Sequence, residues 1–412
     1  MPETAAYLVN PIEAGIKSHV LTLINGLDRS KFEPVLICPP GTSWAKEANC
    51  RVIPLNMAGE ISIWRDFWAA VRLRLILRRV RPKILHIQGM NAGLVGRLAV
   101  AMMRRRPRAI LTVHGFVFDE RISKWRRRPA AWMERRMLRH TDRIVAVSNA
   151  LRDELVSEMG LREDKVQVIY NGIAFRDLPR PQHMGAYIGT VARFVPGKGL
   201  DHFLQAAALV KSRFPEARFF VIGGGPNKYW VETIVKACGI EDCVELMGFR
   251  RDALQIVAGW DVFVLAADRE PFSLALAEAM SQGVPTVASD AGGLPEIVDG
   301  ETTGLLAEAG DAEDFADKIC LLLEDRELAG RMAKAGDEFV RANFTAERMV
   351  AEVQNLYQLS TFNAQRSTFK GRMGRKDRTS NVERPTSKKK MGLIGRMRQR
   401  RRMKRLRKSI GE

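Results

Sequence analysis

The sequence has few cysteines, no long apolar run and no cluster of metal-binding side chains. Its five cysteines lack the spacing of a zinc site or a disulfide framework, which predicts reduced, buried thiols: Cys38, Cys50, Cys238, Cys243 and Cys320. No run of 18 apolar residues occurs, so a membrane-spanning helix is not expected. The first residues lack the basic head and apolar core of a secretory signal, so a cytoplasmic protein is expected. No acidic cluster has metal-ligand spacing, and neither a metal nor a cofactor is expected.

The length and the charge distribution both indicate several structural units. A chain of 412 residues with 46% apolar residues can form two or more domains with substantial cores. The net charge is +14 over residues 1–180, −11 over residues 181–365 and +16 over residues 366–412. A basic half, an acidic half and a basic tail predict separate units with different partners.

Short apolar runs alternate with helical stretches through both halves of the chain. In the first half, such runs are typical of buried strands and lie at residues 7–9, 32–38, 84–87, 109–113 and 144–147. The alternation restarts with the run at residues 187–191. This pattern predicts an α/β fold with two Rossmann-like domains, each built on a parallel sheet.

The most informative stretch begins at Glu270. Glu270 lies in a loop after an apolar strand, and a second carboxylate, Glu278, lies eight positions later in the following helix. Pro271 suits the first position of that helix, whose free N–H groups would attract an anion. The N–H groups left free in this arrangement belong to Phe272, Ser273 and Leu274. A nucleotide-diphosphate sugar, with an anionic centre and hydroxyls at both ends, fits this layout.

Two glycine motifs follow the carboxylates. They are the Gly-x-Pro of Gly283 and Pro285, and the Gly-Gly-x-Pro-Glu run that follows Asp290. With them, the chain resembles the retaining glycosyltransferases of family four over about residues 5–360. The resemblance implies the GT-B fold, in which two Rossmann-like domains face each other across a cleft. It also implies that Glu270 contacts the hydroxyls of the donor sugar and that Glu278 contacts those of the ribose.

The resemblance also assigns donor-binding roles to loop residues of the second half. Arg193 and Lys198, five positions apart after the strand at 187–191, imply contacts with the donor diphosphate. A guanidinium matches the fork of phosphate oxygens, and an ammonium acts as a point charge. The family holds the nucleotide base at the positions of Gly248, Phe249 and Arg250.

In the first half, the resemblance points to one glycine and one histidine. Gly15 lies in the loop after the first strand, where the family has a glycine pair near the donor phosphate; here Ala14 takes the other place. His114 follows the strand at 109–113, at the edge where open α/β sheets bind ligands. The family often has a histidine there, near the sugar and the acceptor. His114 and Glu270 are therefore the predicted catalytic residues.

The domain boundaries follow from these elements. Residues 1–178 are predicted to form the acceptor-binding domain, and residues 184–344 the nucleotide-sugar-binding domain. Residues 345–362 are predicted to form a terminal helix that crosses back to the first domain, as in other GT-B proteins. Residues 363–412 are predicted to be a disordered basic tail, because charged residues outnumber apolar ones there.

Basic side chains and tryptophans are interleaved in the first half. Residues 65–139 hold 20 basic and 4 acidic side chains, among tryptophans that include Trp64, Trp68, Trp125 and Trp132. This mixture is typical of a lipid interface, and the basic tail also favours anionic lipid. Nucleic acid could use the same charge, but no recognition motif accompanies it. The helix expected over residues 61–81 either packs on the sheet by its aromatic stripe or lies at the surface against a bilayer.

The sequence thus favours a retaining, metal-independent glycosyltransferase. The donor would be a nucleotide-diphosphate sugar, with a UDP-sugar favoured. The acceptor would be a lipid-linked or cell-surface polysaccharide precursor at the cytoplasmic face of the membrane. Two alternatives stay open, namely a nucleotide-sugar epimerase or hydrolase on the same fold, and a non-catalytic scaffold that binds lipid or RNA.

Overall fold

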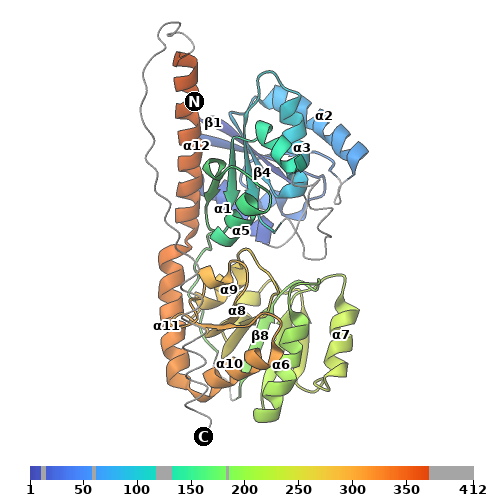
Figure 1. Cartoon of the computed structure of the whole chain (residues 1–412), viewed down its shortest axis with the longest axis vertical. Helices are drawn as coiled ribbons and strands as arrows, with labels where there is room; N and C mark the ends of the chain where they lie inside the picture. The colour runs from blue at the N-terminus through green and yellow to red at the C-terminus, as the bar shows by residue number, and fades with distance from the viewer. Residues whose placement is uncertain (11–14, 58–61, 117–131, 182–184, 371–412) are drawn as a thin grey trace. The chain divides into compact units, whose positions relative to one another are not determined.

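The computed structural model describes residues 1–10, 15–57, 62–116, 132–181 and 185–370, and for Ile63 and residues 359–370 the backbone alone. Residues 1–362 form one compact unit, and residues 363–412 form a second. Within the described part of the first unit there are two parallel sheets with helices on their faces (Figure 1). We call the parts built on the first and second sheets the N-domain and the C-domain.

The N-domain sheet has the strand order β3-β2-β1-β4-β5-β6-β7, and all its neighbouring strands are parallel. Its strands are β1 (Glu3–Val9), β2 (Phe32–Cys38), β3 (Arg51–Pro54), β4 (Ile84–Gln88), β5 (Arg108–Val113), β6 (Arg143–Ala146) and β7 (Val166–Val168). The first, second and fourth of these are mainly apolar and almost entirely buried, as expected for parallel strands covered on both faces.

Alternate residues of these strands face two separate cores. Ala6 and Leu8 pack with the helices α2 (Ile63–Val80), α3 (Met90–Ala101) and α5 (Asn149–Ser157). Ala5 and Tyr7 pack instead with α1 (Gly15–Gly26) and with the C-terminal helix α12 (Ala346–Lys370). The helix α12 therefore completes the N-domain, although it follows the whole C-domain in sequence (Figure 1).

The C-domain sheet has the strand order β10-β9-β8-β11-β12-β13, again all parallel. Its strands are β8 (Tyr187–Val191), β9 (Arg218–Ile222), β10 (Val244–Gly248), β11 (Val262–Leu265), β12 (Thr286–Ser289) and β13 (Leu305–Ala307). Its helices are α6 (Leu200–Arg213), α7 (Lys228–Ala237), α8 (Ala253–Val257), α9 (Leu274–Met280), α10 (Ala312–Glu324) and α11 (Arg326–Asn343). One core includes residues of α6, α7 and α10, and the opposite core includes residues of α8, α9 and α11.

Both sheets reverse their strand order beside their own first strand. The reversal lies between β1 and β4 in the N-domain and between β8 and β11 in the C-domain. Open α/β sheets bind ligands outside the carboxyl ends of the strands at such a switch point, because the two flanking loops diverge there. The predicted site residues that follow β1, β8 and β11 lie in these loops.

Hydrogen bonds and side-chain contacts fix α12 to the N-domain. The hydroxyl of Tyr357 lies 2.6 Å from Nδ1 of His86 and 2.9 Å from the hydroxyl of Tyr7. The position where Gly26 would carry a Cβ lies 2.9 Å from a methyl group of Val350, so that α1 and α12 pack closely. The helix continues to Lys370, past the start of the predicted disordered tail at residue 363; residues 371–412 lie outside the described part of the chain.

The helix α2 does not pack by its aromatic stripe, and that expectation is wrong. The apolar residues that it buries are Ala69, Ala70, Leu73 and Leu77. The side chains of Trp64, Phe67 and Trp68 are instead 78%, 45% and 60% exposed. The alanines allow α2 to approach α3 and the sheet closely, so the bulky residues are left on the outer face.

Candidate functional site

The loop that follows β8 carries the predicted basic pair, and its glycines determine how closely it packs. Gly199 has a positive φ of 63°, and a Cβ at this position would overlap the carbonyl of Ala266 at the end of β11. The backbone N–H of Asp268 donates to the carbonyl of Gly197 over 3.2 Å. The loops on the two sides of the switch point are therefore in direct contact, which only glycine permits here.

This contact brings Lys198 and Glu270 together. The ammonium of Lys198 donates to the Glu270 carboxylate, and both side chains are largely buried. Arg193, at the start of the same loop, is exposed, and no described side chain pairs with it. Lys198 is thus held against Glu270, the predicted sugar-binding acid, whereas Arg193 is available to bind an anion.

The Gly-Gly motif has a direct structural reason. Gly292 has a positive φ of 61°, and a Cβ there would overlap the carbonyl of Glu270. A Cβ on Gly293 would overlap the carbonyl of Pro271 and would lie 2.9 Å from the Cβ of Ser148 in the N-domain. The N–H of Gly293 donates to the Glu270 carbonyl over 2.8 Å. The two glycines therefore hold the backbone of the Glu270 loop in place.

The helix after Glu270 begins later than expected. It starts at Leu274, and Ser273 is its N-cap, with its hydroxyl accepting from the N–H of Leu276. Pro271 is therefore not the first helical residue. Of the three predicted N–H donors, Phe272 precedes the helix, Ser273 is its N-cap and Leu274 is its first residue. The close contact with Gly293 holds residues 270 and 271 in the loop before the helix. Glu278 lies a little more than one turn into this short helix.

Glu278 is the acid with the most unusual environment in the region. Burial raises the pKa of this carboxyl to about 7, although Arg176 nearby lowers it. No hydrogen bond from a described residue stabilises its charged form, so the cost of removing it from water is not repaid. A carboxylate kept in this state is typical of a ligand-binding position, since hydroxyl donors from a ligand would supply the missing bonds.

The third predicted loop, after β10, has a different character. Gly248 has a positive φ of 68°, and its carbonyl accepts from the N–H of Gly223 over 2.9 Å. Phe249 is 80% exposed, and Arg250 forms a local ion pair with Asp252 at 2.6 Å. The aromatic ring is therefore free to contact a ligand, whereas the arginine is already paired within its own turn.

In the N-domain, Gly15 lies against the C-domain. It is the first residue of α1, and a Cβ there would lie 3.6 Å from a methyl group of Leu274 at the start of α9. Ala14 lies outside the described residues. Gly15, which is predicted to lie near the donor phosphate, is thus close to the helix that follows the Glu270 loop.

His114 follows β5, beside the N-domain switch point. Its Nε2 lies 2.8 Å from the side-chain oxygen of Gln88, the last residue of β4. The ring of His19 stands edge-on to it, with 4.6 Å between the ring centroids. Burial and the neighbouring His19 and His86 hold the pKa of His114 well below its usual value, so the ring is neutral at pH 7.

Two residues join the domains: Glu296, the last residue of the Gly-Gly-x-Pro-Glu motif, for which the sequence indicated no role, and Arg269, which the sequence did not single out. The carboxylate of Glu296 accepts hydrogen bonds from the N–H groups of Asn149 and Ala150 at the start of α5, both over 2.8 Å. It also accepts from the hydroxyl of Tyr170 over 2.7 Å. Arg269, next to Glu270, pairs with the buried Glu154 at 2.8 Å. These contacts cross between the domains close to the predicted site.

Metal ligands are not grouped in this region. Across the described ranges, no three His, Cys, Asp or Glu side chains come together in a way that could hold a metal ion. Of the predicted charged groups, Lys198 contacts Glu270 at the C-domain switch point, Arg193 lies exposed at the start of the loop that carries Lys198, and Glu278 lies on the helix that follows Glu270.

Comparisons with known proteins match both domains. Residues 175–339 match the family described as "Glycosyl transferases group 1", and residues 14–176 match "Glycosyltransferase Family 4". The chain is a group 1 glycosyltransferase of the family-four type. The predicted family is therefore confirmed, and the two matches meet between β7 and β8, where the domains join.

Two relatives of this glycosyltransferase are named for a diphosphoundecaprenol-linked acceptor and for capsular polysaccharide biosynthesis. An Escherichia coli UDP-Gal:alpha-D-GlcNAc-diphosphoundecaprenol alpha-1,3-galactosyltransferase is 25% identical over 369 residues, which cover 84% of this chain and 94% of that protein. The capsular polysaccharide biosynthesis glycosyltransferase CapM of Staphylococcus aureus is 26% identical, over 74% of this chain and 84% of its own length.

Solved structures confirm the predicted GT-B fold of the glycosyltransferase. Sucrose-phosphate synthase from Thermosynechococcus elongatus superposes with a TM-score of 0.74 at 21% identity, over 88% of this chain and 100% of that one. Anabaena HepE in complex with UDP-glucose gives a TM-score of 0.74 at 20% identity, over 87% and 100% of the two chains. At these identities the likeness establishes the fold alone.

Proposed function

We propose that this glycosyltransferase moves a sugar from a UDP-sugar to a lipid-linked or cell-surface polysaccharide precursor, with retention and without a metal ion. The observation that carries the proposal is the contact between Lys198 and Glu270 at the C-domain switch point, with Arg193 exposed at the start of the same loop as Lys198. A diphosphate needs cations and a sugar needs hydroxyl-binding acids, and the contact between Lys198 and Glu270 supplies both in one place.

The proposed reaction uses these groups on the leaving diphosphate. The bond between the anomeric carbon and the phosphate oxygen breaks while the acceptor hydroxyl approaches from the same face of the sugar. Negative charge grows on the diphosphate, where Arg193 and Lys198 stabilise it more than in the ground state. The proton of the acceptor hydroxyl passes to the departing phosphate oxygen, so no protein nucleophile is needed.

The choice of donor and acceptor rests on the relatives. The E. coli relative is named for a UDP-sugar and a diphosphoundecaprenol acceptor, and the HepE structure holds UDP-glucose. CapM is named for capsular polysaccharide, and LpsD of Rhizobium meliloti for the lipopolysaccharide core. A UDP-sugar and a surface-glycan precursor are the substrates that these names share most often.

The test is a thermal-shift screen of UDP-, GDP- and ADP-sugars, followed by transfer to membrane lipid extracts. We expect a UDP-sugar to raise the melting temperature and to donate its sugar to an extracted lipid. Proton NMR of the product should show the anomeric configuration of the donor, and EDTA should leave the rate unchanged. If the folded protein shows neither a thermal shift nor transfer with any of these sugars, the proposal is refuted.

The same assay separates the alternative functions. Consumption of the donor without an acceptor would indicate an epimerase or a hydrolase. Donor binding without any transfer would indicate a non-catalytic scaffold. The intact set of Arg193, Lys198, Glu270 and Glu278 favours transfer over a scaffold.

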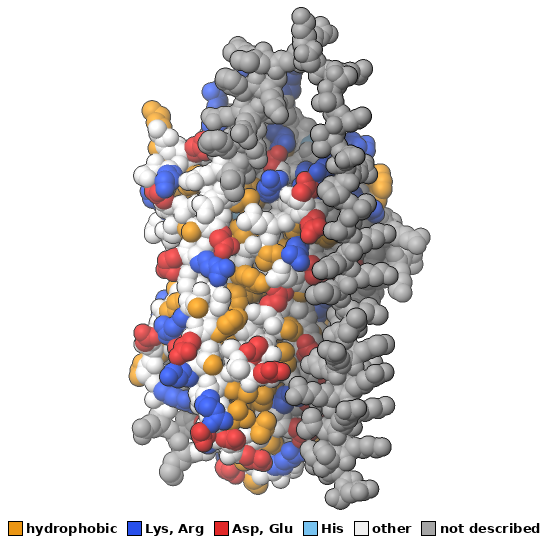
Figure 2. Space-filling view, turned by 60° about the vertical axis from the view of Figure 1, so that its left-hand side comes forward, with side chains coloured by type: hydrophobic (Ala, Val, Ile, Leu, Met, Phe, Trp, Pro, Cys, Tyr) orange, Lys and Arg blue, Asp and Glu red, His pale blue; other side chains and the backbone are white. Residues whose placement is uncertain are grey.

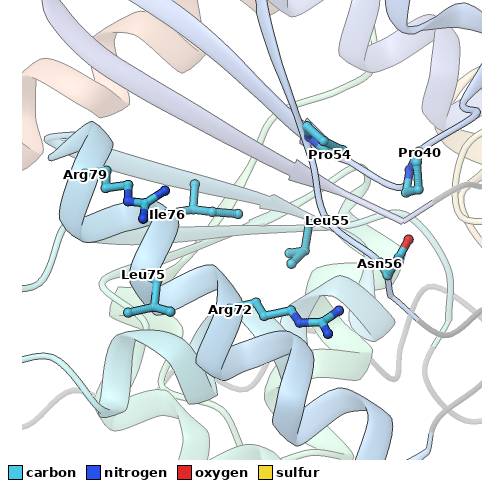
Figure 3. Close-up of a pocket in the computed structure, with 8 residues that line it drawn as sticks. All are labelled: Pro40, Pro54, Leu55, Asn56, Arg72, Leu75, Ile76 and Arg79. Carbon is cyan, nitrogen blue, oxygen red and sulfur yellow. The ribbon is translucent and has the colours of Figure 1, made fainter.

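The membrane part of the proposal is supported by the exposed face of α2. Trp64, Phe67 and Trp68 lie on it, and the same helix lines a hollow of about 380 Å³ with Arg72 and Arg79 (Figure 3). Aromatic rings at headgroup level and arginines on phosphates hold a protein at an anionic bilayer. Trp125 and the tail from residue 371 lie outside the described residues. No helix of the described chain is both long and apolar enough to span a bilayer.

Sedimentation with anionic vesicles tests this surface. Replacing Trp64 and Trp68 with serine should weaken binding, whereas Leu321→Ser should not, since this exposed leucine lies on α10 of the C-domain. Deleting residues 366–412 should weaken binding most at low salt, because its contribution is electrostatic. Unchanged sedimentation in all variants would remove the membrane from the proposal, and competition by RNA would favour nucleic acid.

A further inference from the structure

The N-domain switch point holds an uncharged polar pair, Gln88 and His114. Gln88 ends β4, next to the point where the strand order reverses, and its side chain is 1% exposed. Its oxygen lies 2.8 Å from Nε2 of His114, at the end of the neighbouring strand β5. Gln88 is buried, and its side-chain oxygen is hydrogen-bonded to the imidazole of His114. It can therefore control which nitrogen of that ring carries a proton.

The hydrogen bond determines which nitrogen of His114 carries the proton. A carbonyl oxygen only accepts, so Nε2 of His114 must donate, and a neutral ring then keeps a lone pair on Nδ1. The titratable groups that act on His114 are His19 on α1 and His86 on β4, and burial and these two neighbours lower the pKa of His114. The ring therefore stays in one neutral tautomer at physiological pH.

His19 restricts the orientation of the ring. It packs edge-on to His114, with an interplanar angle of 77°, and is 2% exposed. The side-chain nitrogen of Gln88 is buried and has no partner among the described residues. A buried donor of this kind requires a partner, which water or a ligand hydroxyl can supply.

We propose that Gln88 is a positioning residue for glycosyl transfer, which holds His114 as the Nε2–H tautomer so that Nδ1 accepts a hydrogen bond from a sugar hydroxyl. The identity of the hydroxyl rests on the function proposed above, whereas the tautomer does not. A neutral acceptor is suited to this edge, because an imidazolium there would compete with Arg193 and Lys198 for the diphosphate.

The tautomer can be read directly by long-range proton–nitrogen NMR of the full-length protein labelled at its six histidines. The signal of His114 is assigned as the one lost in His114→Asn. We expect the Nε2–H pattern, unchanged between pH 5.5 and 8.5, while the partly exposed His140 titrates in the same spectra. A His114 that carries its proton on Nδ1, or that titrates near its ordinary pKa, would overturn the proposal.

The variant Gln88→Glu changes the charge and nearly preserves the shape. A carboxylate in place of the amide favours the imidazolium, so the signal of His114 should now titrate within the neutral range. The pH profile of transfer should shift with it. If the His114 spectrum of Gln88→Glu is identical to that of the wild type, Gln88 does not control the ring.

A double-mutant cycle tests the effect on transfer. Gln88→Leu should lower kcat by about fivefold to tenfold, the value of one hydrogen bond, with little change in donor KM. In a His114→Ala background the same substitution should change kcat less than about twofold, because Gln88 acts through His114. Equal losses in both backgrounds would show a merely structural role.

The two proposals fail in different ways. If no sugar is transferred by the wild type, the proposed function fails while the NMR result still decides the tautomer. If transfer is normal and the tautomer is wrong, only the role of Gln88 fails. Urea unfolding of each variant identifies any loss that is due to misfolding.

Discussion

The first six strands of the two sheets have the same order. The switch point beside β1 in the N-domain is therefore equivalent to the switch point beside β8 in the C-domain. In the C-domain this place holds charged groups, with Lys198 against Glu270 and with Arg193 exposed. In the N-domain it holds Gln88 and a neutral His114. One topology therefore carries two kinds of chemistry, and the side chains in the loops decide which.

This difference corresponds to the two substrates of a glycosyl transfer. On the proposed function, the cations at the C-domain switch point bind the diphosphate of the donor, and the acids there bind its hydroxyls. The uncharged pair of Gln88 and His114 then serves hydroxyls on the N-domain side. On the face shown in Figure 2, basic and acidic side chains are interspersed.

The largest expected effect follows from removing the charge at the C-domain switch point. Because a charged hydrogen bond contributes about 1.5–3 kcal/mol, Arg193→Ala or Lys198→Ala should lower kcat/KM by about tenfold to a hundredfold or more. The matched control Lys211→Ala removes the same charge from α6, where it pairs with Asp242, and should keep the wild-type kcat/KM. Wild-type turnover by both site variants would exclude these residues from the site.

A second variant tests the close packing that holds the charged loop. Gly293→Ala should lower the free energy of unfolding by about 1–3 kcal/mol and raise the donor KM, because the new methyl group displaces the Glu270 loop. Gly330→Ala is the control, since a Cβ at this exposed position of α11 meets nothing within 4 Å, and it should stabilise the protein by about 0.5–1 kcal/mol. Urea denaturation and donor titration measure both variants.

A third variant tests the contact between the two domains. Glu296→Ala leaves the N–H groups at the start of α5 without their acceptor, so the free energy of unfolding should fall by about 1–3 kcal/mol. Glu327→Ala removes an exposed ion pair with Arg331 and should change it by less than about 0.5 kcal/mol. Equal effects in urea denaturation would mean that Glu296 does not join the domains in solution.

The smallest expected effect is a dependence on pH that belongs to the C-domain. The pKa of Glu278 rises from an ordinary 4.5 to about 7 in the folded state, so the folded protein keeps a proton that the unfolded chain has lost. Its contribution to stability is therefore present below pH 4.5 and is lost as the pH rises through about 7. The free energy of unfolding of Glu278→Gln is measured by urea denaturation and compared with that of the wild type. The difference should grow in favour of the variant by on the order of 2 kcal/mol from pH 5 to pH 8. Parallel pH curves for the two proteins would contradict this.

Much of the fold could be predicted from local pattern. The buried parallel strands are continuous apolar runs, and the run from Glu270 to Glu296 has a spacing that few other arrangements produce. The start of α9 could not be predicted, because Pro271 is a good helix starter whose conformation is determined by Gly293, 22 positions later. Local preference gives way to a distant contact there.

Contacts between side chains that are far apart in the sequence could not be predicted either. Gln88 and His114 lie 26 positions apart, and Glu296 and Asn149 lie 147 apart, so neither pair forms a pattern in sequence. On α2, apolar residues cover two sides of the helix, and periodicity does not say which side turns inward. Their volume decides it, since Ala69 and Ala70 fit against the sheet and Trp64 and Trp68 do not.

The contact between Tyr357 and Tyr7 has a consequence for biosynthesis. The first strand leaves the ribosome well before the aromatic residue that covers it, because Tyr357 lies 350 positions after Tyr7. Until then, one side of the nascent N-domain sheet lacks its last helix and presents apolar surface to the cytosol or to a chaperone. The C-domain has all its own strands and helices before that moment, so it is expected to reach its native state first, and the domain made first is finished last.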